Sequence, residues 1–439
     1  MAKPFLPGRV FLWLKIKRRA TLFYTQQLKQ RGKNMTRQYT SILKNRTFML
    51  LLIAGIFSVT GFSMFLTTTS WYVIRTLGMP EMLGLVLIAV TVPRLVMMIY
   101  GGVLADNYKK STIMFGTNIF QAALLVLITI FIGLDFMTLG WFLVLAGLFG
   151  TVDAFFGPAS TSMIPKVVER AQLQKANAYF QGVDQISFLL GPVLAGLIME
   201  FGSVTMSFMV AAILVTLSAV FVFPPLIREG PVENTVKQSP LQNFIEGFNY
   251  VKGSNFLMVG IIVLVTLNFF VFGTLHIAVP FLTDLYGGTP INLSIMEMSL
   301  SFGMLIGMIV LGNQYIKRKG RTAVYGLLVT LIIYIVFSFI ESLSILPILL
   351  FFIGLAMSFV FIPFFTATQQ ITENRMMGRV MSLIFLAMNG FDPLAYAIVG
   401  IMTAAGISIQ LVLLGFGLIG LVITMVILWK AKGFQRLET

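Results

Sequence analysis

The chain has 439 residues, of which 57% are hydrophobic and only 11% are charged. Soluble globular proteins carry about 25% charged residues, so this composition excludes a soluble enzyme, a disordered chain and a nucleic-acid-binding protein. The net charge of +15 does not restore a nucleic-acid function, because the basic residues stand in short segments between apolar runs.

The chain contains no cysteine and a single histidine, His276. This excludes disulfides, thiolate metal sites, cysteine nucleophiles and metal motifs built from several histidines. We therefore expect neither a metal nor a cofactor. The sequence has no phosphate-binding loop motif either, which argues against ATP as an energy source.

The first 46 residues form a basic tail that holds 12 of the 31 lysines and arginines and no acidic residue. Its apolar run around Trp13 is too short to cross a bilayer, and no convincing cleavage site follows, so we do not expect a secretory signal. Two interpretations stay open. The tail is an interfacial helix on anionic lipid, or it is an extension ahead of a true start at Met35.

Twelve apolar runs follow the tail, and each is long enough to cross a bilayer as a helix of about 20 residues. They lie at 47–75, 82–105, 112–133, 139–164, 176–200, 206–224, 256–281, 296–315, 322–340, 345–368, 380–404 and 407–429. A β-barrel would need short segments of alternating polarity, which are absent. The sequence predicts an all-α polytopic membrane protein with twelve transmembrane helices.

The basic residues also predict the orientation of these helices. With the amino terminus in the cytoplasm, 29 of the 31 lysines and arginines lie on the inner side, and the exceptions are Arg75, at an outer helix end, and Arg94, inside a helix. The outer loops carry acids instead, at Glu81, Asp135, Glu200, Asp284 and Glu341. We expect a multi-pass protein of the cell membrane with both termini in the cytoplasm.

A polar linker divides the twelve spans into six and six. The predicted domains are a tail at 1–46, a bundle at 47–225, the linker at 226–254, a bundle at 255–429 and a tail at 430–439. Faint repeats connect the halves, such as Pro158 with Pro363 and Gly102 with Gly312. They predict two six-helix bundles related by a pseudo-two-fold axis, with a substrate site between them. Apolar residues at helical spacing in 241–251 indicate a further helix along the inner surface.

A motif between the second and third spans comprises Gly102, Asp106, Lys109 and Lys110. A glycine lets two helices approach closely, and an acid can bind the free N–H groups at a helix end. Lysines that pair with this acid would complete a gating loop. An ordinary basic inner loop is the alternative.

A second motif, with Gly191, Pro192 and Gly196 on the fifth span, combines small residues with a proline. These motifs resemble those of the major facilitator superfamily over nearly all of residues 35–435. The second motif resembles one common in antiporters of that superfamily, although Ser187 replaces its opening glycine, and plain helix packing explains it as well. The segments 173–178 and 378–380 resemble the bacterial branch that includes macrolide-efflux and enterobactin-export proteins. The resemblance implies an exporter.

Four ionisable residues within the predicted spans stand out: Arg94, Asp153, Asp184 and Asp392. A charge in the hydrocarbon costs about 2.5–3.5 kcal/mol, so such residues are functional candidates. We hypothesise that one or more of the aspartates binds a coupling proton, with Asp184 the first candidate and Asp153 the second. The alternatives are a structural ion pair with Arg94 and, for Asp392, a contact with an inner loop.

Six further polar residues in the spans are candidates for the lining of a substrate pocket. They are Asn118, Gln121, Gln181, Asn268, His276 and Asn389. Hydrogen bonds between helices are the alternative role for each of them.

The resemblance thus implies a secondary transporter that exports amphipathic drugs or secreted metabolites by alternating access, and we expect it to be coupled to protons. Its expected partners are a small-molecule substrate and membrane lipids, without nucleic acid, and the expected state is a monomer. A carrier of lipids or lysophospholipids is the main alternative. An intramembrane enzyme lacks the motifs that it would need, and a signalling scaffold would not need the gating-loop motif.

Overall fold

A computed structural model describes residues 42–169, 172–227, 229, 240–312, 314, 316–373 and 375–436. The basic tail before residue 42, with both of its interpretations, lies outside this range. In the described part of the chain, all regular elements are helical.

Twelve helical segments are long and apolar enough to cross a membrane, which confirms the predicted number. The first set of six comprises α2 (Arg46–Trp71) with the π-helical turn η2 (Tyr72–Thr76), η3 (Pro80–Met82) with α3 (Leu83–Asn107), α4 (Lys110–Gly133), α5 (Leu139–Asp153) with α6 (Phe156–Val167), α7 (Leu173–Phe201) and α8 (Val204–Phe221). The second set comprises α10 (Asn255–Leu267) with the π-helical turn η6 (Asn268–Phe272) and α11 (Gly273–Leu285), α12 (Pro290–Gly312), α13 (Lys319–Phe337), α14 (Leu346–Ile371), α15 (Met377–Asn389) with α16 (Asp392–Ala404), and α17 (Ile409–Lys430).

Short helices flank these spans: η1 (Ile42–Lys44), η5 (Pro224–Leu226), α9 (Pro240–Gly253) and α18 (Lys432–Arg436). The helix predicted in the linker is present as α9, and it packs against α15. Arg379 on α15 forms an ion pair with Glu246 on α9. The second part of the linker is therefore attached to the second set of spans.

Two spans that the sequence predicts as continuous are broken. The fourth span changes direction between α5 and α6, at Ala154 and Phe155, because Pro158 has no N–H to donate to the carbonyl of Ala154. The eleventh span breaks between α15 and α16, where Pro393 occupies the first turn of α16. Both breaks carry an acid, Asp153 at the end of α5 and Asp392 at the start of α16.

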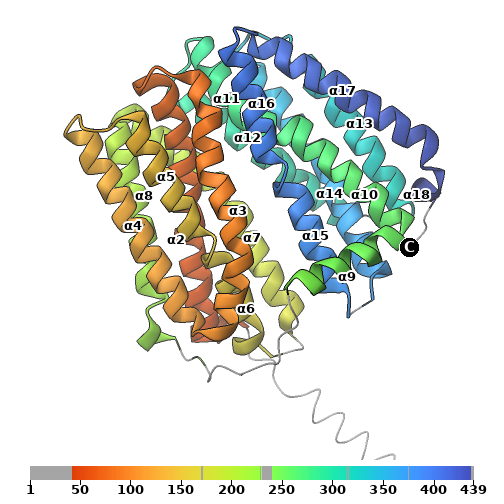
Figure 1. The fold of residues 1–439 in the computed structure, drawn as a ribbon, viewed down its shortest axis with the longest axis horizontal. Helices are drawn as coiled ribbons and strands as arrows, with labels where there is room; N and C mark the ends of the chain where they lie inside the picture. The colour runs from red at the N-terminus through yellow and green to blue at the C-terminus, as the bar shows by residue number, and fades with distance from the viewer. Residues whose placement is uncertain are drawn as a thin grey trace, which may run out of the picture. The chain divides into compact units, whose positions relative to one another are not determined.

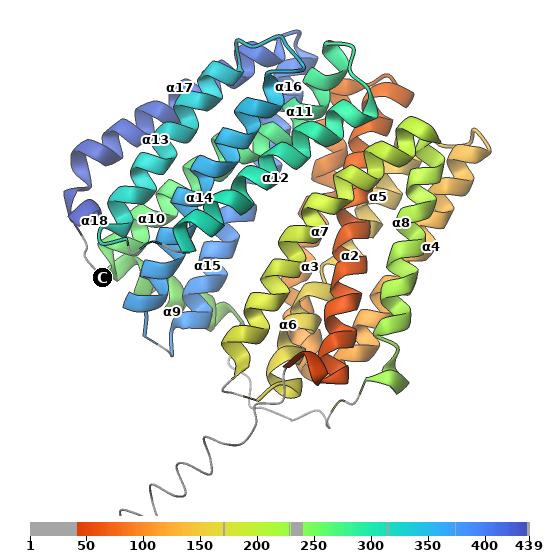
Figure 2. The same cartoon turned by 180° about the vertical axis from the view of Figure 1, so that it is seen from behind.

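Each set packs mainly within itself, through α3 with α5 and α4 with α8 in the first, and through α14 with α12 and α13 in the second. Contacts between the sets join α7 to α12 and α3 to α16, which lie side by side in Figures 1 and 2. Glycines permit these approaches, since a Cβ atom on Gly84 of α3 would lie 2.5 Å from the carbonyl oxygen of Tyr396 on α16.

Candidate functional site

A cavity of about 840 Å³ lies between the two sets of spans. The first set contributes α2, α3, α5, α6 and α7 to its wall, and the second set contributes Gln369 on α14 and Phe385 and Asn389 on α15. Its volume falls in the range of about 300–1,000 Å³ that is typical of small-molecule sites. Phenylalanines, amides and three ionisable side chains share its surface, so it offers both apolar and polar contacts.

The charged pair Arg94 and Asp153 borders this cavity. Their helices meet backbone to backbone, because a Cβ atom on Gly150 of α5 would lie 2.0 Å from the carbonyl oxygen of Val90 on α3. This approach brings the Nε atom of Arg94 within 2.7 Å of the Oδ2 atom of Asp153.

Further contacts complete the environment of this pair. Gln121 on α4 donates a hydrogen bond of 3.1 Å to the second carboxylate oxygen of Asp153. The guanidinium carbon of Arg94 lies 4.6 Å from the centre of the Phe62 ring. Asp153, the second candidate for proton binding, is thus neutralised by Arg94 in this conformation.

The energetic importance of the pair is testable with the variants Arg94→Gln and Asp153→Asn. Each single variant removes one charge and leaves the charge of its partner uncompensated, whereas the double variant removes both charges. We expect each single variant to lower the melting temperature in detergent, and the double variant to lose less than their sum, with a coupling of about 0.5–3 kcal/mol.

The pair Arg75–Asp284 is the control for this cycle, because its arginine is 54% exposed and exposed pairs contribute about 0–1 kcal/mol. Full additivity of the Arg94 and Asp153 variants would show that the ion pair does not stabilise the fold.

Asp184 on α7 differs from Asp153. Its side chain is exposed to the cavity, and it has no ion pair or hydrogen bond among the residues that the structure describes. The charges of Arg94 and Asp153 cancel each other. The carboxyl group of Asp184 is therefore the one uncompensated acidic group in the described cavity wall. Asp153 and Asp184 border one cavity, and only Asp184 is available there to bind a cation or a proton.

The six polar candidates separate into two groups. Gln181 and Asn389 line the cavity. Gln121 lies behind it, hydrogen-bonded to Asp153, and Asn118 is fully buried between Ser58 and Ser218, with hydrogen bonds of 3.4 and 2.7 Å. Asn118 and Gln121 are outside the wall of this cavity, and both make the hydrogen bonds between helices that are their alternative predicted role.

Asn268 and His276 also lie outside the wall of this cavity. Asn268 donates to the carbonyl of Leu264 within its own segment, beside the π-helical turn. The Nδ1 atom of His276 lies 2.9 Å from the hydroxyl of Tyr396, and its ring stacks edge-on against Phe272. Both side chains are thus hydrogen-bonded to residues of the second set.

Among the described residues, Asp392 has no hydrogen bond or ion pair with an inner loop, which was one of its two predicted roles. It is 8% exposed and begins α16 at the break in the eleventh span. Its Oδ1 atom has no hydrogen-bond partner in the described part of the chain. A Cβ atom on Gly273 of α11 would lie 3.6 Å from that oxygen, so α11 covers the carboxyl group.

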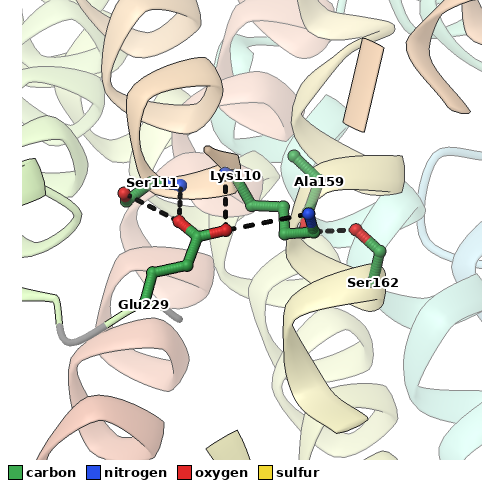
Figure 3. Close-up of polar contacts among 5 residues, drawn as sticks. All are labelled: Lys110, Ser111, Ala159, Ser162 and Glu229. Atoms are coloured by element: carbon green, nitrogen blue, oxygen red, sulfur yellow. Dashed lines mark hydrogen bonds and ion pairs between the residues drawn. The ribbon is translucent and has the colours of Figure 1, made fainter. Parts of the chain in front are cut away.

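The gating-loop motif makes a contact that the sequence did not predict. The backbone N–H groups of Lys110 and Ser111 donate to the carboxylate of Glu229 over 2.9 and 3.1 Å, and the Lys110 ammonium lies 3.7 Å from it (Figure 3). Glu229 thus caps the start of α4, where free N–H groups favour an anion. Lys109 is exposed, whereas the surroundings of Gly102 and the side chain of Asp106 lie outside the described part.

The second motif lies where helices meet. A Cβ atom on Gly191 would lie 2.5 Å from the side chain of Ser63 on α2, and one on Gly196 would lie 1.8 Å from the Oγ atom of Ser294 on α12. Ser294 donates a hydrogen bond of 2.5 Å to the carbonyl of Pro192. Both glycines therefore stand at close helix contacts, and Gly196 stands between the two sets.

The sequence analysis missed two acids. Glu229 stands in the polar linker, where nothing indicates its partner. Glu297 lies in the second turn of α12, and its Oε2 atom is 2.6 Å from the hydroxyl of Thr67 on α2. The predicted eighth run starts at 296, but the helix begins at Pro290, because proline is favoured in the first turn. That proline is the signal that would have placed Glu297 about two turns inside the span instead of at its first residues.

A family model matches residues 51–393, which is more than half of the chain. The chain belongs to the Major Facilitator Superfamily. With its twelve apolar helical segments, it is a multi-pass membrane protein of that superfamily.

Relatives in this superfamily confirm the predicted resemblance to the efflux branch. Macrolide efflux protein A of Streptococcus pyogenes is 29% identical over 252 residues, which are 55% of this chain and 59% of that protein. The chain thus spans less than two thirds of that relative. The protein of the same name from Enterococcus faecalis is 28% identical over 64% of this chain and 88% of its own length. Multidrug efflux pump Tap of Mycolicibacterium fortuitum is 24% identical over 85% of this chain and 95% of that protein.

Solved structures confirm the predicted fold class. The nucleoside transporter NupG superposes with a TM-score of 0.68 at 15% identity, over 88% of this chain and 99% of its own. The chain also superposes on a bacterial homologue of the human lysosomal transporter Spinster in an inward-facing and unoccupied conformation. The TM-score is 0.67 at 14% identity, over 90% of this chain and 96% of that one.

Proposed function

We propose that this member of the superfamily exports amphipathic small molecules that carry a cationic group, by alternating access and in exchange for protons. The observation that carries the proposal is the cavity of about 840 Å³, whose wall combines aromatic rings with the acidic group of Asp184. An apolar body with a positive charge fits such a wall, because the rings bind the apolar part and the carboxylate binds the cation.

Contacts between the two sets of spans support alternating access. At the end of the molecule away from the cavity, Thr67 meets Glu297 at 2.6 Å, and Arg75 meets Asp284 at 2.8 Å. We call this end, with the Pro192–Ser294 hydrogen bond, the closed end. A cavity between two sets that are held together at the opposite end is the arrangement expected of one state of a rocking carrier.

The distribution of basic residues supports the side on which the cavity opens. The cavity uses the parts of α6 and α7 that lead to Lys166 and Lys175, which belong to a loop predicted to lie in the cytoplasm. With both termini inside, the closed end faces outward. Substrate would enter the cavity from the cytoplasm, in agreement with export, and the efflux functions named for the relatives point the same way.

The test is transport by the purified full chain in lipid vesicles with an imposed pH gradient. The probes are a cationic dye, a macrolide antibiotic, a neutral analogue of each, and a fluorescent lysophospholipid. We expect gradient-driven movement of the cationic probes, abolished by a protonophore, and little movement of the neutral analogues.

Two results would overturn the proposal. Rates equal to those of protein-free vesicles for all probes would exclude the transporter as described. Movement of the lysophospholipid alone would favour the lipid carrier over the exporter of small molecules.

A further inference from the structure

We propose that Glu297 is a proton-binding site that controls the closed end: it holds a proton while the two sets touch there, and loss of this proton opens that end. The inference rests on the alternating access proposed above. It concerns a group outside the cavity wall, at the contact between α12 of the second set and α2 of the first.

The number of available hydrogen atoms indicates the protonated form. The hydroxyl of Thr67 lies 2.6 Å from the Oε2 atom of Glu297 and 3.3 Å from the carbonyl oxygen of Ser63. A hydroxyl has one hydrogen to donate, and a carbonyl or a carboxylate only accepts. A carboxylate at Glu297 would have to share the single hydrogen of Thr67 with the carbonyl of Ser63. A protonated Glu297 that donates to Thr67 leaves the hydrogen of Thr67 free for Ser63, so that each contact is a full hydrogen bond, and this favours a proton on Glu297 while the two sets touch.

The charges around Glu297 agree with this assignment. Helix α14 has no charged residue, and α2 has none between Thr47 and Trp71. On α11, His276 is bonded to Tyr396 and Asp284 is paired with Arg75.

Helix α7, the remaining neighbour of α12, carries Asp184, Glu200 and Lys175. Lys175 stands 17 residues before Pro192, which contacts α12, and this is about 25 Å along a helix. In the described part of the chain, Glu297 therefore has no cation to compensate a negative charge.

Loss of the proton from Glu297 changes the relative stability of the closed and open forms of the contact between α2 and α12. A carboxylate at this position would keep one donor, Thr67, and would remain within a membrane span without a compensating cation, which is unfavourable for a charge. Separation of α2 and α12 exposes it to water and removes that cost. Protonation thus stabilises the closed end and deprotonation the open one. A proton bound from outside would return the carrier to its inward-open state, which is the direction that exchange for an exported substrate requires.

The test follows the distance across the closed end as a function of pH. Because the chain contains no cysteine, cysteines introduced at the exposed loop residues Phe136 and Phe339 carry the only spin labels. In the doubly labelled protein without further substitutions, we expect the population with the longer distance between labels to grow as the pH rises. The ratio of the two populations should change by up to about tenfold per pH unit, since one proton is released.

The variant Glu297→Gln keeps a donor for Thr67 and cannot ionise, so it should stay at the short distance at every pH. The variant Thr67→Val should weaken the contact and shift the distance distribution toward the open form. Two controls match them. Thr69→Val removes a buried hydroxyl of the same helix that has no partner in the described part, and Glu200→Gln removes an exposed acid on α7. Both should respond to pH as the parent does.

A Glu297→Gln variant that opens with pH as the parent does would overturn the inference, and so would a parent whose distance does not change with pH. Transport in vesicles is measured on the same proteins. A distance that responds to pH through Glu297, without transport of any probe, would leave the proton site in place and refute the exporter.

Discussion

Replacement of Asp184 by asparagine is expected to weaken binding of cationic probes about ten- to hundredfold and to reduce their gradient-driven transport to a similar extent. Interactions with a charged group contribute about 1.5–3 kcal/mol, and each 1.4 kcal/mol is a factor of ten in affinity. Asparagine keeps the size and polarity of the side chain but removes the charge that Arg94 and Asp153 leave uncompensated in the cavity. Binding of a neutral analogue should change little.

The matched control is Asp135→Asn, in the loop between α4 and α5. Asp135 has a positive φ of 52°, a conformation that asparagine also tolerates, so the control removes one acid without backbone strain. Binding is measured by fluorescence titration of the purified protein, and transport in vesicles. Undiminished affinity and full gradient dependence in Asp184→Asn would remove Asp184 from both substrate and proton binding.

The number of spans and their approximate positions follow from hydropathy, because each run must satisfy its backbone hydrogen bonds within one helix. Hydropathy does not detect the breaks at Ala154 and Phe391, since apolar residues continue on both sides of them. The prolines at 158 and 393 carry that information, but proline also occurs inside unbroken helices of this protein, such as α3 and α7.

The cavity site was predictable only in part, because the direction in which a side chain points and the residues that it contacts depend on neighbouring helices. Asp153 and Asp184 both look like isolated acids in apolar runs, and the close approach at Gly150 is what gives Asp153 a partner and leaves Asp184 without one. Asn118 resembles Gln181 in sequence, yet α2 and α8 supply it with two serine hydroxyls. These distinctions arise from packing between segments far apart in the chain.

Replacement of Gly196 by valine is expected to force open the closed end. A Cβ atom at this position would lie 1.8 Å from the Oγ atom of Ser294 and 2.7 Å from the carbonyl oxygen of Pro290, so α7 and α12 must separate. Overpacking costs about 1–3 kcal/mol, and because the two helices belong to different sets, this cost destabilises the closed end. The labels at Phe136 and Phe339 should report a shift toward the longer distance of about ten- to hundredfold in population.

Two controls separate this effect from a general loss of stability. Gly182→Val adds the same side chain to the same helix at a place with no atom within 4 Å, and should leave the distance unchanged. Gly303→Val creates a clash at 2.0 Å with the carbonyl oxygen of Phe351, but between α12 and α14 of one set, and should lower the melting temperature without opening. If Gly196→Val behaved like Gly303→Val, the contact between α7 and α12 would be part of the permanent core and not of the surface that separates when the carrier changes state.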